Sequence, residues 1–240
     1  MYSLSNAFSN EDIYNFLKQI RSFLDLSESE NIDLVFEPKI DGLSLSLIYK
    51  NGTLFQALTR GDGQIGEDVT ETVLQMDKRI IPCNIKSWPQ HLFKDENNAL
   101  PKYIEVRGEI YIPSDTFVEI NQRRLEDGLT MYSTARNAAA GNLRRIHNSE
   151  AKNNYTKSLK FFAYSLLYSD KIGDDDLPIE HRSFDQDMVL PTLNEMGFEA
   201  VDLSSNIPLH ANNDSSISKE LYGGFIAEQL LNECQRIYDT

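Results

Sequence analysis

The sequence has few cysteines, no long apolar run and no leader-like N-terminus. Its 240 residues include two cysteines, Cys83 and Cys234, which form no CxxC pair and have no histidine cluster nearby. This argues against a disulfide framework or a zinc site within the chain and is typical of a reducing compartment. The longest apolar stretch, FFAYSLLY at 161–168, is far shorter than the roughly 20 residues of a membrane helix. The N-terminal MYSLSNAFSNED lacks the basic and apolar regions of a secretory signal. We therefore expect a cytoplasmic protein with no membrane partner.

Basic residues are also scarce. Lys and Arg total 23 against 37 Asp and Glu, which gives a net charge of -14. Such a surface repels nucleic acids, so a polyanion would need a local basic patch or a basic neighbouring domain. Residues 133–149 contain three arginines and no acids. This segment is the best candidate for a surface that faces phosphate or DNA, and the alternative is a small-residue helix with solvated arginines.

The order of helical and strand patterns predicts an α+β fold. Ser9 is placed to cap the first helix, Asn51-Gly52 is a strong hairpin signal, and Pro191 falls within a later helical segment. Helices and strands follow one another without a βαβ rhythm, so we expect antiparallel sheets flanked by helices. The predicted strands are 32–39, 43–50, 53–60, 103–112 and 158–168, and the predicted helices are 9–24, 67–76, 114–126, one from about 183 and one from about 218.

The segment EPKIDG, residues 37–42, carries the most informative charges. In an extended chain Glu37, Lys39 and Asp41 point to one face, where they are costly to bury unless they pair or bind a ligand. One interpretation is a solvated strand edge with a paired lysine. The other is a lysine nucleophile, which attacks only in its deprotonated form and would be helped by a nearby cation such as Arg60. The hexapeptide alone leaves both open.

Two further segments carry chemistry-bearing residues. In RGDGQIGED, residues 60–68, glycines before a helix can expose backbone N–H groups to an anion, although the three acids oppose this. A tight loop with an acid-capped helix is the alternative. In VRGEIY, residues 106–111, Arg107, Glu109 and Tyr111 share one strand face. Glu109 is placed to accept a hydrogen bond from a ribose hydroxyl, to hold a metal, or to form an ordinary cross-strand ion pair.

Taken together, the blocks EPKIDG, TRGDGQIGEDVTETV, VRGEIYIP and ARNAAAGNLRR resemble the adenylation (nucleotidyltransferase) domain of bacterial NAD-dependent DNA ligases. The resemblance extends over nearly the whole chain. KxDG alone is shared with ATP-dependent ligases and mRNA capping enzymes, whereas RGDGxxGED and RNAAAGxLR look specific to the NAD-dependent branch. The resemblance implies the nucleotidyltransferase fold that DNA ligases share with mRNA capping enzymes, and a role in DNA replication and repair.

The resemblance also implies residue roles. Lys39 would attack the α-phosphate of NAD and carry AMP, with Asp41 supporting it. Glu37 would contact the adenine and Glu109 the ribose. Arg136 and Arg144 would face nicked double-stranded DNA. The residues implied to contact the nucleotide are Ser3, Leu4, Glu37, Lys39, Arg60 and Glu109.

In the implied reaction AMP passes from the lysine to the 5′-phosphate of a nick, and the 3′-hydroxyl then displaces it. Mg²⁺, or alternatively Mn²⁺, would assist at the phosphates, and no metal-ligand set is expected within this chain. We expect one adenylation domain, residues 1–240, truncated at both ends. The missing parts would be the NMN-binding N-terminal domain, the C-terminal lysine motifs, and the OB, zinc-finger (with its zinc), helix-hairpin-helix and BRCT parts. Such a fragment is expected to be unable to ligate alone, to self-adenylate at most very weakly, and not to oligomerise.

Two alternatives remain at this point. The chain could be the core of an ATP- or GTP-dependent nucleotidyltransferase, such as an RNA ligase or capping enzyme, although this predicts the absence of the RGDGxxGED and RNAAAGxLR blocks. It could also be a non-catalytic adenosine-binding module, in which adenosine binding is independent of Lys39 and no covalent adduct forms.

Overall fold

The computed structural model describes residues 7–27, 35, 37–61, 65–86, 88–89, 100–144, 156–173 and 177–201. The chain divides into two compact units. One comprises Met1–Pro38 and Ser204–Thr240, and the other, here named the sheet unit, comprises Lys39–Leu203. The described elements are α1 (Asn10–Phe23), β1 (Leu43–Lys50), β2 (Thr53–Thr59), α2 (Thr70–Leu74), β3 (Tyr103–Tyr111), α3 (Ser114–Glu126), α4 (Ala135–Arg144), a 3₁₀ turn (Thr156–Ser158), β4 (Lys160–Ser169) and α5 (Gln186–Glu195).

Helix α1 begins where the sequence predicts. The Ser9 side chain accepts a hydrogen bond from the Asp12 backbone N–H at 3.2 Å. In return the Asp12 carboxylate accepts from the Ser9 hydroxyl and from the Phe8 backbone N–H, each at 2.9 Å. These bonds satisfy N–H groups that have no partner inside the helix. They also lower the pKa of Asp12.

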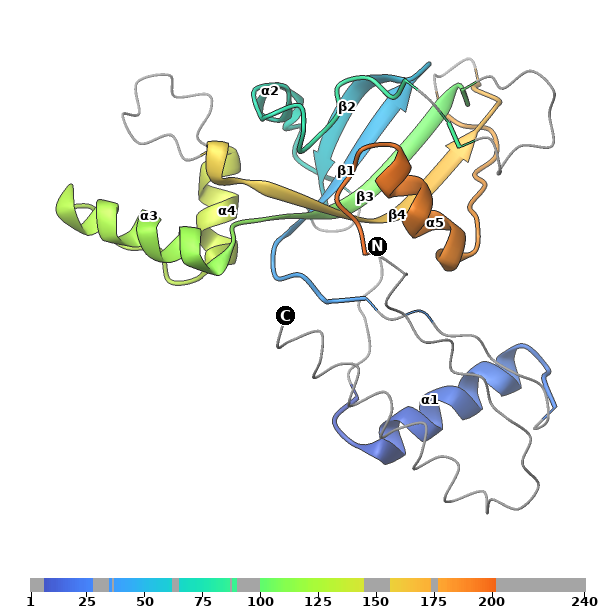
Figure 1. Cartoon of the computed structure of the whole chain (residues 1–240). Coiled ribbons are helices and arrows are strands. Elements are labelled where there is room, and N and C mark those ends of the chain that lie inside the picture. Colours follow the sequence, from blue (N-terminus) through green and yellow to red (C-terminus); the bar gives the residue numbers. More distant parts are fainter. Residues whose placement is uncertain are drawn as a thin grey trace. The chain divides into compact units, whose positions relative to one another are not determined.

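The sheet unit is built on four antiparallel strands in the order β2-β1-β3-β4, which confirms the α+β class (Figure 1). Strands β1 and β2 form the predicted hairpin. Asn51 and Gly52 both have positive φ, 49° and 78°, as a tight two-residue turn requires. The strands predicted over 43–50, 53–60, 103–112 and 158–168 are all confirmed to within two residues at their ends.

The predictions for residues 32–39 and 67–76 are wrong in the described residues. Of the predicted strand 32–39 the structure describes residues 35 and 37–39, and none of these lies in a strand. Pro38 contributes to this, because it has no N–H for a ladder hydrogen bond. The helix predicted over 67–76 is shortened to α2, since Asp68 instead pairs with Leu58 in a β-bridge and caps Thr70. The predicted final helix from about 218 lies outside the described residues.

Helix α5 runs through Pro191 without a break and ends before Gly197, which has a φ of 92°. The sequence predicted an interruption or restart at this proline. Pro191 lies only one turn into the helix, and the carbonyl that it cannot bond belongs to the exposed Asp187. Water can satisfy that carbonyl, so the cost of the proline is reduced.

The sheet has one apolar face and one mixed polar face. On β1, Leu45, Leu47 and Tyr49 are fully buried, and they alternate with half-buried residues that point to the other side. Phe198, just after α5, packs edge-on against Tyr49 and Phe161 with ring centroids 6.2 and 6.1 Å away. Each large side chain buried here contributes about 1.5–3 kcal/mol of transfer free energy. The apolar face therefore forms the core of the sheet unit.

Each edge strand of the sheet carries additional backbone pairing. Thr53 and Leu58 of β2 form bridges with Asn84 and Asp68. On the opposite edge, Phe162 of β4 pairs with Glu199, and Tyr168 pairs with Arg182. These irregular segments occupy part of the hydrogen-bonding groups that an edge strand otherwise presents.

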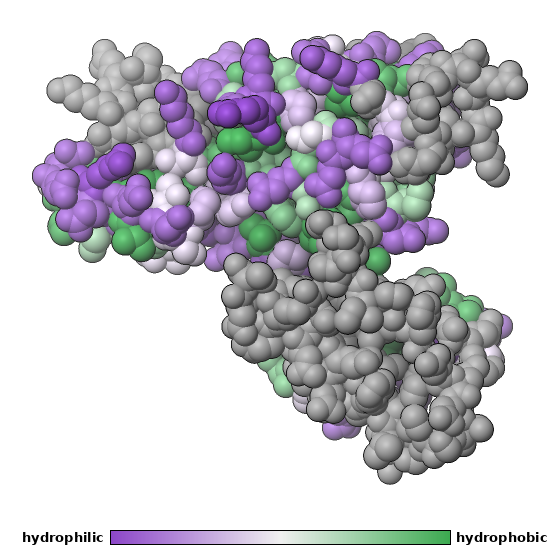
Figure 2. Space-filling view, in the orientation of Figure 1, coloured by the Kyte–Doolittle hydropathy of each residue, from purple (hydrophilic) through white to green (hydrophobic). Residues whose placement is uncertain are grey.

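Hydrophilic side chains are spread over the visible face of the sheet unit, with apolar ones between them (Figure 2). Within the described residues, no helix combines the length and apolar character that crossing a membrane requires.

Candidate functional site

The polar face carries two serine–glutamate pairs that join β1 to β3. Ser44 lies opposite Glu109, and its hydroxyl donates a hydrogen bond of 2.5 Å to Glu109 Oε1. Ser46 donates to Glu105 Oε1 at 2.7 Å, and Arg107 Nε donates to the same oxygen at 2.6 Å. The half-buried Arg107 and Glu109 alternate with fully buried neighbours, as predicted for one strand face.

Glu109 is where the predicted site residues converge. Its side chain is half-buried, and burial raises the pKa of Glu109. The hydrogen bond from Ser44 opposes this shift, as do the positive charges of Arg136, Lys39 and Arg60, in that order. Three cations from separate parts of the chain therefore lie close enough to act on one carboxyl group. None of the three is adjacent in sequence to Glu109, so the fold brings them together.

Lys39 lies on the connection that leads into β1. Lys39 and Asp41 are exposed while Ile40 between them is half-buried, so the predicted alternation holds for these residues. Gly42 is buried directly against the Ile110 carbonyl oxygen, where an added Cβ would overlap it. The glycine is needed for this close approach rather than for an unusual φ. It brings the end of the lysine segment onto β3, beside Glu109.

The two predicted DNA-facing arginines lie at the two ends of α4, and both are exposed. Arg136 Nη1 lies 3.8 Å from Asp41 Oδ1, and Arg144 Nε lies 3.2 Å from Glu67 Oε2. Exposed ion pairs of this kind contribute only about 0–1 kcal/mol, so they are readily exchanged for other anions. The buried residues of α4 are small or apolar apart from one asparagine; they are Ala138, Ala139, Asn142 and Leu143.

The other three predicted nucleotide contacts do not belong to the described residues of the sheet unit. Ser3 and Leu4 lie outside the described residues. Glu37 is half-buried and belongs to the other compact unit.

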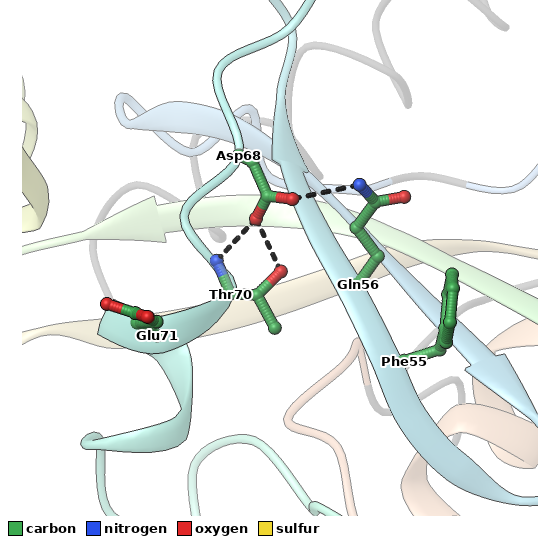
Figure 3. Close-up of a pocket in the computed structure, with 5 residues that line it drawn as sticks. All are labelled: Phe55, Gln56, Asp68, Thr70 and Glu71. Atoms are coloured by element: carbon green, nitrogen blue, oxygen red, sulfur yellow. Dashed lines mark hydrogen bonds between the residues drawn. The ribbon is translucent and has the colours of Figure 1, made fainter.

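An open hollow of about 400 Å³ lies elsewhere, between β2 and the start of α2 (Figure 3). Asp68 Oδ2 accepts from Gln56 Nε2 at 2.9 Å, while Oδ1 accepts from the N–H and hydroxyl of Thr70 at 3.0 and 2.6 Å. These bonds lower the pKa of Asp68. None of the predicted nucleotide contacts lines this hollow; its residues are Phe55, Gln56, Asp68, Thr70 and Glu71. The hollow and the charged cluster are therefore different features, and the cluster is the candidate site.

Sequence reasoning missed Ser44 and Tyr164. The β3–β4 register shifts between Arg107 and Gly108, which leaves Tyr164 as an extra residue on β4. Burial and the charge of Glu109 raise the pKa of Tyr164, whereas Ser44, Arg107 and Arg60 lower it. Tyr164 thus lies on the polar face beside Ser44 and Glu109. The alternation in LSLSL could have placed Ser44 on this face, but the bulge at Tyr164 has no local sequence signal.

The described residues contain no group of three histidine, cysteine or acidic side chains able to hold a metal ion. Cys83 is a half-buried free thiol.

The fold and the charged cluster together define an α+β domain whose sheet presents a cation-rich site around a half-buried carboxyl, an arrangement suited to anionic ligands with polar groups. The family of the NAD-dependent DNA ligase adenylation domain matches residues 1–215, and this chain belongs to that family. The match favours the NAD-dependent branch over the ATP- or GTP-dependent alternatives.

Similar proteins from bacteria support the family. The DNA ligase of Hyphomonas neptunium is 43% identical over 165 residues, which cover 69% of this chain and 21% of that protein. The DNA ligase of Maricaulis maris is 40% identical over 205 residues, covering 85% of this chain and 26% of that protein. The DNA ligase of Rickettsia massiliae is 38% identical over 204 residues, with the same coverage of 85% and 26%. The matched part of the chain spans about a fifth to a quarter of the length of these relatives.

Proposed function

We propose that the chain performs the self-adenylation step of a bacterial, cytoplasmic NAD-dependent DNA ligase and has the nucleotidyltransferase fold. In this step Lys39 Nζ attacks the α-phosphorus of NAD. A P–N bond forms, the P–O bond to nicotinamide mononucleotide breaks, and the amine loses a proton. The lysine then carries AMP. In the longer protein AMP passes to the 5′-phosphate of a nick, and the 3′-hydroxyl displaces it to seal the strand.

The observation that carries the proposal is the convergence of Lys39, Arg60 and Arg136 on Glu109. The lysine attacks in its deprotonated form. The guanidinium groups of Arg60 and Arg136 stabilise the charge that develops on the phosphoryl oxygens. Glu109 accepts from the ribose hydroxyls of the adenylate. Asp41, two residues after the lysine, supports it during the transfer.

The remaining predicted contacts complete the nucleotide site in this proposal. Glu37 contacts the adenine, and Ser3 and Leu4, outside the described residues, line the adenosine pocket. Mg²⁺ supplies positive charge at the phosphates during transfer. Because the described residues contain no cluster of three protein ligands, the ion would depend largely on phosphate oxygens, as Mg²⁺ commonly does.

We propose that Arg136 and Arg144 contact the phosphates of nicked DNA. Both are exposed, and their present partners, Asp41 and Glu67, are exposed as well. A DNA phosphate can replace such a partner at small cost, because neither ion pair is buried. The net charge of -14 means that this contribution is local and that the longer protein must supply most of the DNA affinity.

The direct test is intact-mass spectrometry after incubation with NAD and Mg²⁺, in this chain and in the longer protein. The longer wild-type protein should gain the mass of one AMP, whereas this chain alone should be adenylated at most very weakly. Lys39→Arg should gain none while remaining folded, because a guanidinium stays protonated. Lys50→Arg is a matched control, since the Lys50 ammonium lies 3.7 Å from the Phe55 ring centre and its substitution should leave the adduct intact.

Other outcomes would contradict the proposal in distinct ways. An adduct that persists in Lys39→Arg would show that Lys39 is the wrong lysine. An adduct formed from ATP but not from NAD would indicate an ATP-dependent nucleotidyltransferase. Adenosine binding that is unaffected by Lys39→Ala, with no adduct under any condition, would indicate a non-catalytic binding module.

A further inference from the structure

Side chains from three adjacent strands meet on the polar face. Ser44 comes from β1, Glu109 from β3 and Tyr164 from β4. The Ser44 hydroxyl donates its proton to Glu109 Oε1. Interaction with Ser44 also lowers the pKa of the neighbouring Tyr164 phenol. Ser44 therefore lies between a carboxylate and a phenol and interacts with both.

Ser44 supplies something to Glu109 that the three cations do not. Lys39, Arg60 and Arg136 act on the carboxyl group through their charge, which favours ionisation without fixing an orientation. Within the described part of the chain, Ser44 is the side chain that hydrogen-bonds to Glu109. A short bond between directly opposed residues of paired strands holds the carboxylate plane. It uses Oε1 and leaves Oε2 to accept from a ligand.

We propose that Ser44 is a positioning residue that orients Glu109 so that its second oxygen accepts hydrogen bonds from the ribose hydroxyls of the adenylate. The inference rests on the proposed function, in which Glu109 binds the ribose. Ser44 itself does not touch the nucleotide. Its effect is confined to the direction and the ionisation of the Glu109 carboxylate.

Ser46 provides a matched control on the same strand and the same face. It donates to Glu105 at 2.7 Å, which is a similar bond between a serine and a glutamate. Glu105, however, also accepts from Arg107 Nε at 2.6 Å. Ser46→Ala therefore leaves Glu105 with a charged donor, whereas Ser44→Ala leaves Glu109 without a hydrogen-bond donor from the described residues.

The first experiment needs no nucleotide. The side-chain carboxyl of Glu109 is titrated by NMR in the wild type, Ser44→Ala, Ser44→Thr and Ser46→Ala. Because the bond stabilises the ionised form, Ser44→Ala should move the Glu109 titration to higher pH, and Ser44→Thr should restore it. Ser46→Ala should leave it unchanged. An unaltered Glu109 titration in Ser44→Ala would overturn the inference whatever the function of the chain.

The second experiment measures adenosine binding by calorimetry at neutral pH. Ser44→Ala should bind adenosine about tenfold more weakly than the wild type, the effect of one lost hydrogen bond to a charged group. With an adenosine analogue that lacks both ribose hydroxyls, the wild type and Ser44→Ala should bind equally.

If the wild type and Ser44→Ala differ as much in their affinity for the analogue as for adenosine, Ser44 is not acting through ribose recognition. If the wild type binds adenosine and its analogue equally, the role of Glu109 in the proposed function fails together with this inference. If Ser44→Ala binds adenosine with the same affinity as the wild type, and the wild type still binds adenosine more tightly than the analogue, only the inference about Ser44 fails.

Discussion

The packing of Gly42 against β3 makes a quantitative prediction about the lysine segment. A Cβ at position 42 would overlap the Ile110 carbonyl oxygen and would lie 3.1 Å from the Ile110 carbonyl carbon and 3.2 Å from Tyr111 Cβ. All of these atoms belong to the backbone or to a Cβ, so none can move without shifting the strand. Overpacking of this kind costs about 1–3 kcal/mol. For a chain of this length, Gly42→Ala should lower the melting temperature by about 2–12 °C.

The same substitution should affect chemistry more than stability. Ile110 follows Glu109 directly, so a segment displaced from Ile110 also displaces Lys39 from the charged cluster. A shift of about 1 Å in a reacting group can cost about a hundredfold in rate. The rate of AMP adduct formation, followed by intact mass, should fall by about this factor in Gly42→Ala.

Gly128→Ala controls for the loss of stability alone. Gly128 has a φ of 69° and no atom within 4 Å of its built Cβ, so alanine introduces backbone strain without a clash. The strain costs about 1–2 kcal/mol. Melting is followed by circular dichroism in both variants. A Gly42→Ala chain that melts like the wild type would refute the packing argument. Equal adduct rates in the two glycine variants would show that the contact with Ile110 does not position the lysine.

Three further predictions concern charged residues. Burial raises the pKa of Glu109, so the protonated carboxyl group is more stable in the folded chain than in the unfolded chain. The stability that protonated Glu109 contributes is lost as the pH rises from the unfolded pKa of 4.5 through the raised folded pKa. Denaturant unfolding across this window should show the wild type losing stability relative to Glu109→Gln, and a pH-independent difference would contradict this. Arg124 is 6% exposed, its guanidinium lies 4.3 Å from the Tyr132 ring centre, and it donates a hydrogen bond to a backbone carbonyl. Arg124→Ala should therefore lower the free energy of unfolding by about 2–4 kcal/mol. In the same unfolding assay, substitution of the exposed Arg123 by alanine should lower it by less than about 0.5 kcal/mol. Arg144→Ala should change the free energy of unfolding by less than about 1 kcal/mol. It should weaken the binding of nicked DNA by the longer protein and make the affinity less dependent on salt concentration. A salt dependence equal to that of the wild type would show that Arg144 does not contact DNA phosphates.

Local signals in the sequence predicted the elements that depend on local physics. Ser9 and Asp12 mark the start of α1 because their side chains accept hydrogen bonds from the backbone N–H groups of Asp12 and Phe8. Asn51-Gly52 marks the hairpin because both residues tolerate positive φ. The alternation of Arg107 and Glu109 with apolar neighbours placed their side chains on one face of β3.

Predictions that depended on distant contacts were less accurate. The start of α2 is set by the bridge between Asp68 and Leu58, which belongs to another strand. The strand expected before Lys39 is absent from its described residues, although its composition is strand-like. Propensity is a weak guide where tertiary pairing decides the outcome.

For the site, the sequence could name candidate residues but not their arrangement. Lys39, Arg60 and Glu109 were selected by motif and resemblance, and only the folded structure shows that the charges of Lys39 and Arg60 act on Glu109. Ser44 required the β1–β3 register, and Tyr164 required the bulge in β4. Both are consequences of how strands align, which a single sequence does not encode locally.

The bridges along both borders of the sheet have a consequence for assembly. Asn84 and Asp68 pair with β2, and Glu199 and Arg182 pair with β4, so part of the backbone with which a further strand could pair is already occupied. Addition of a further strand is therefore disfavoured at the bridged residues of both borders. Contacts through side chains on the exposed faces of the sheet and helices do not have this limit.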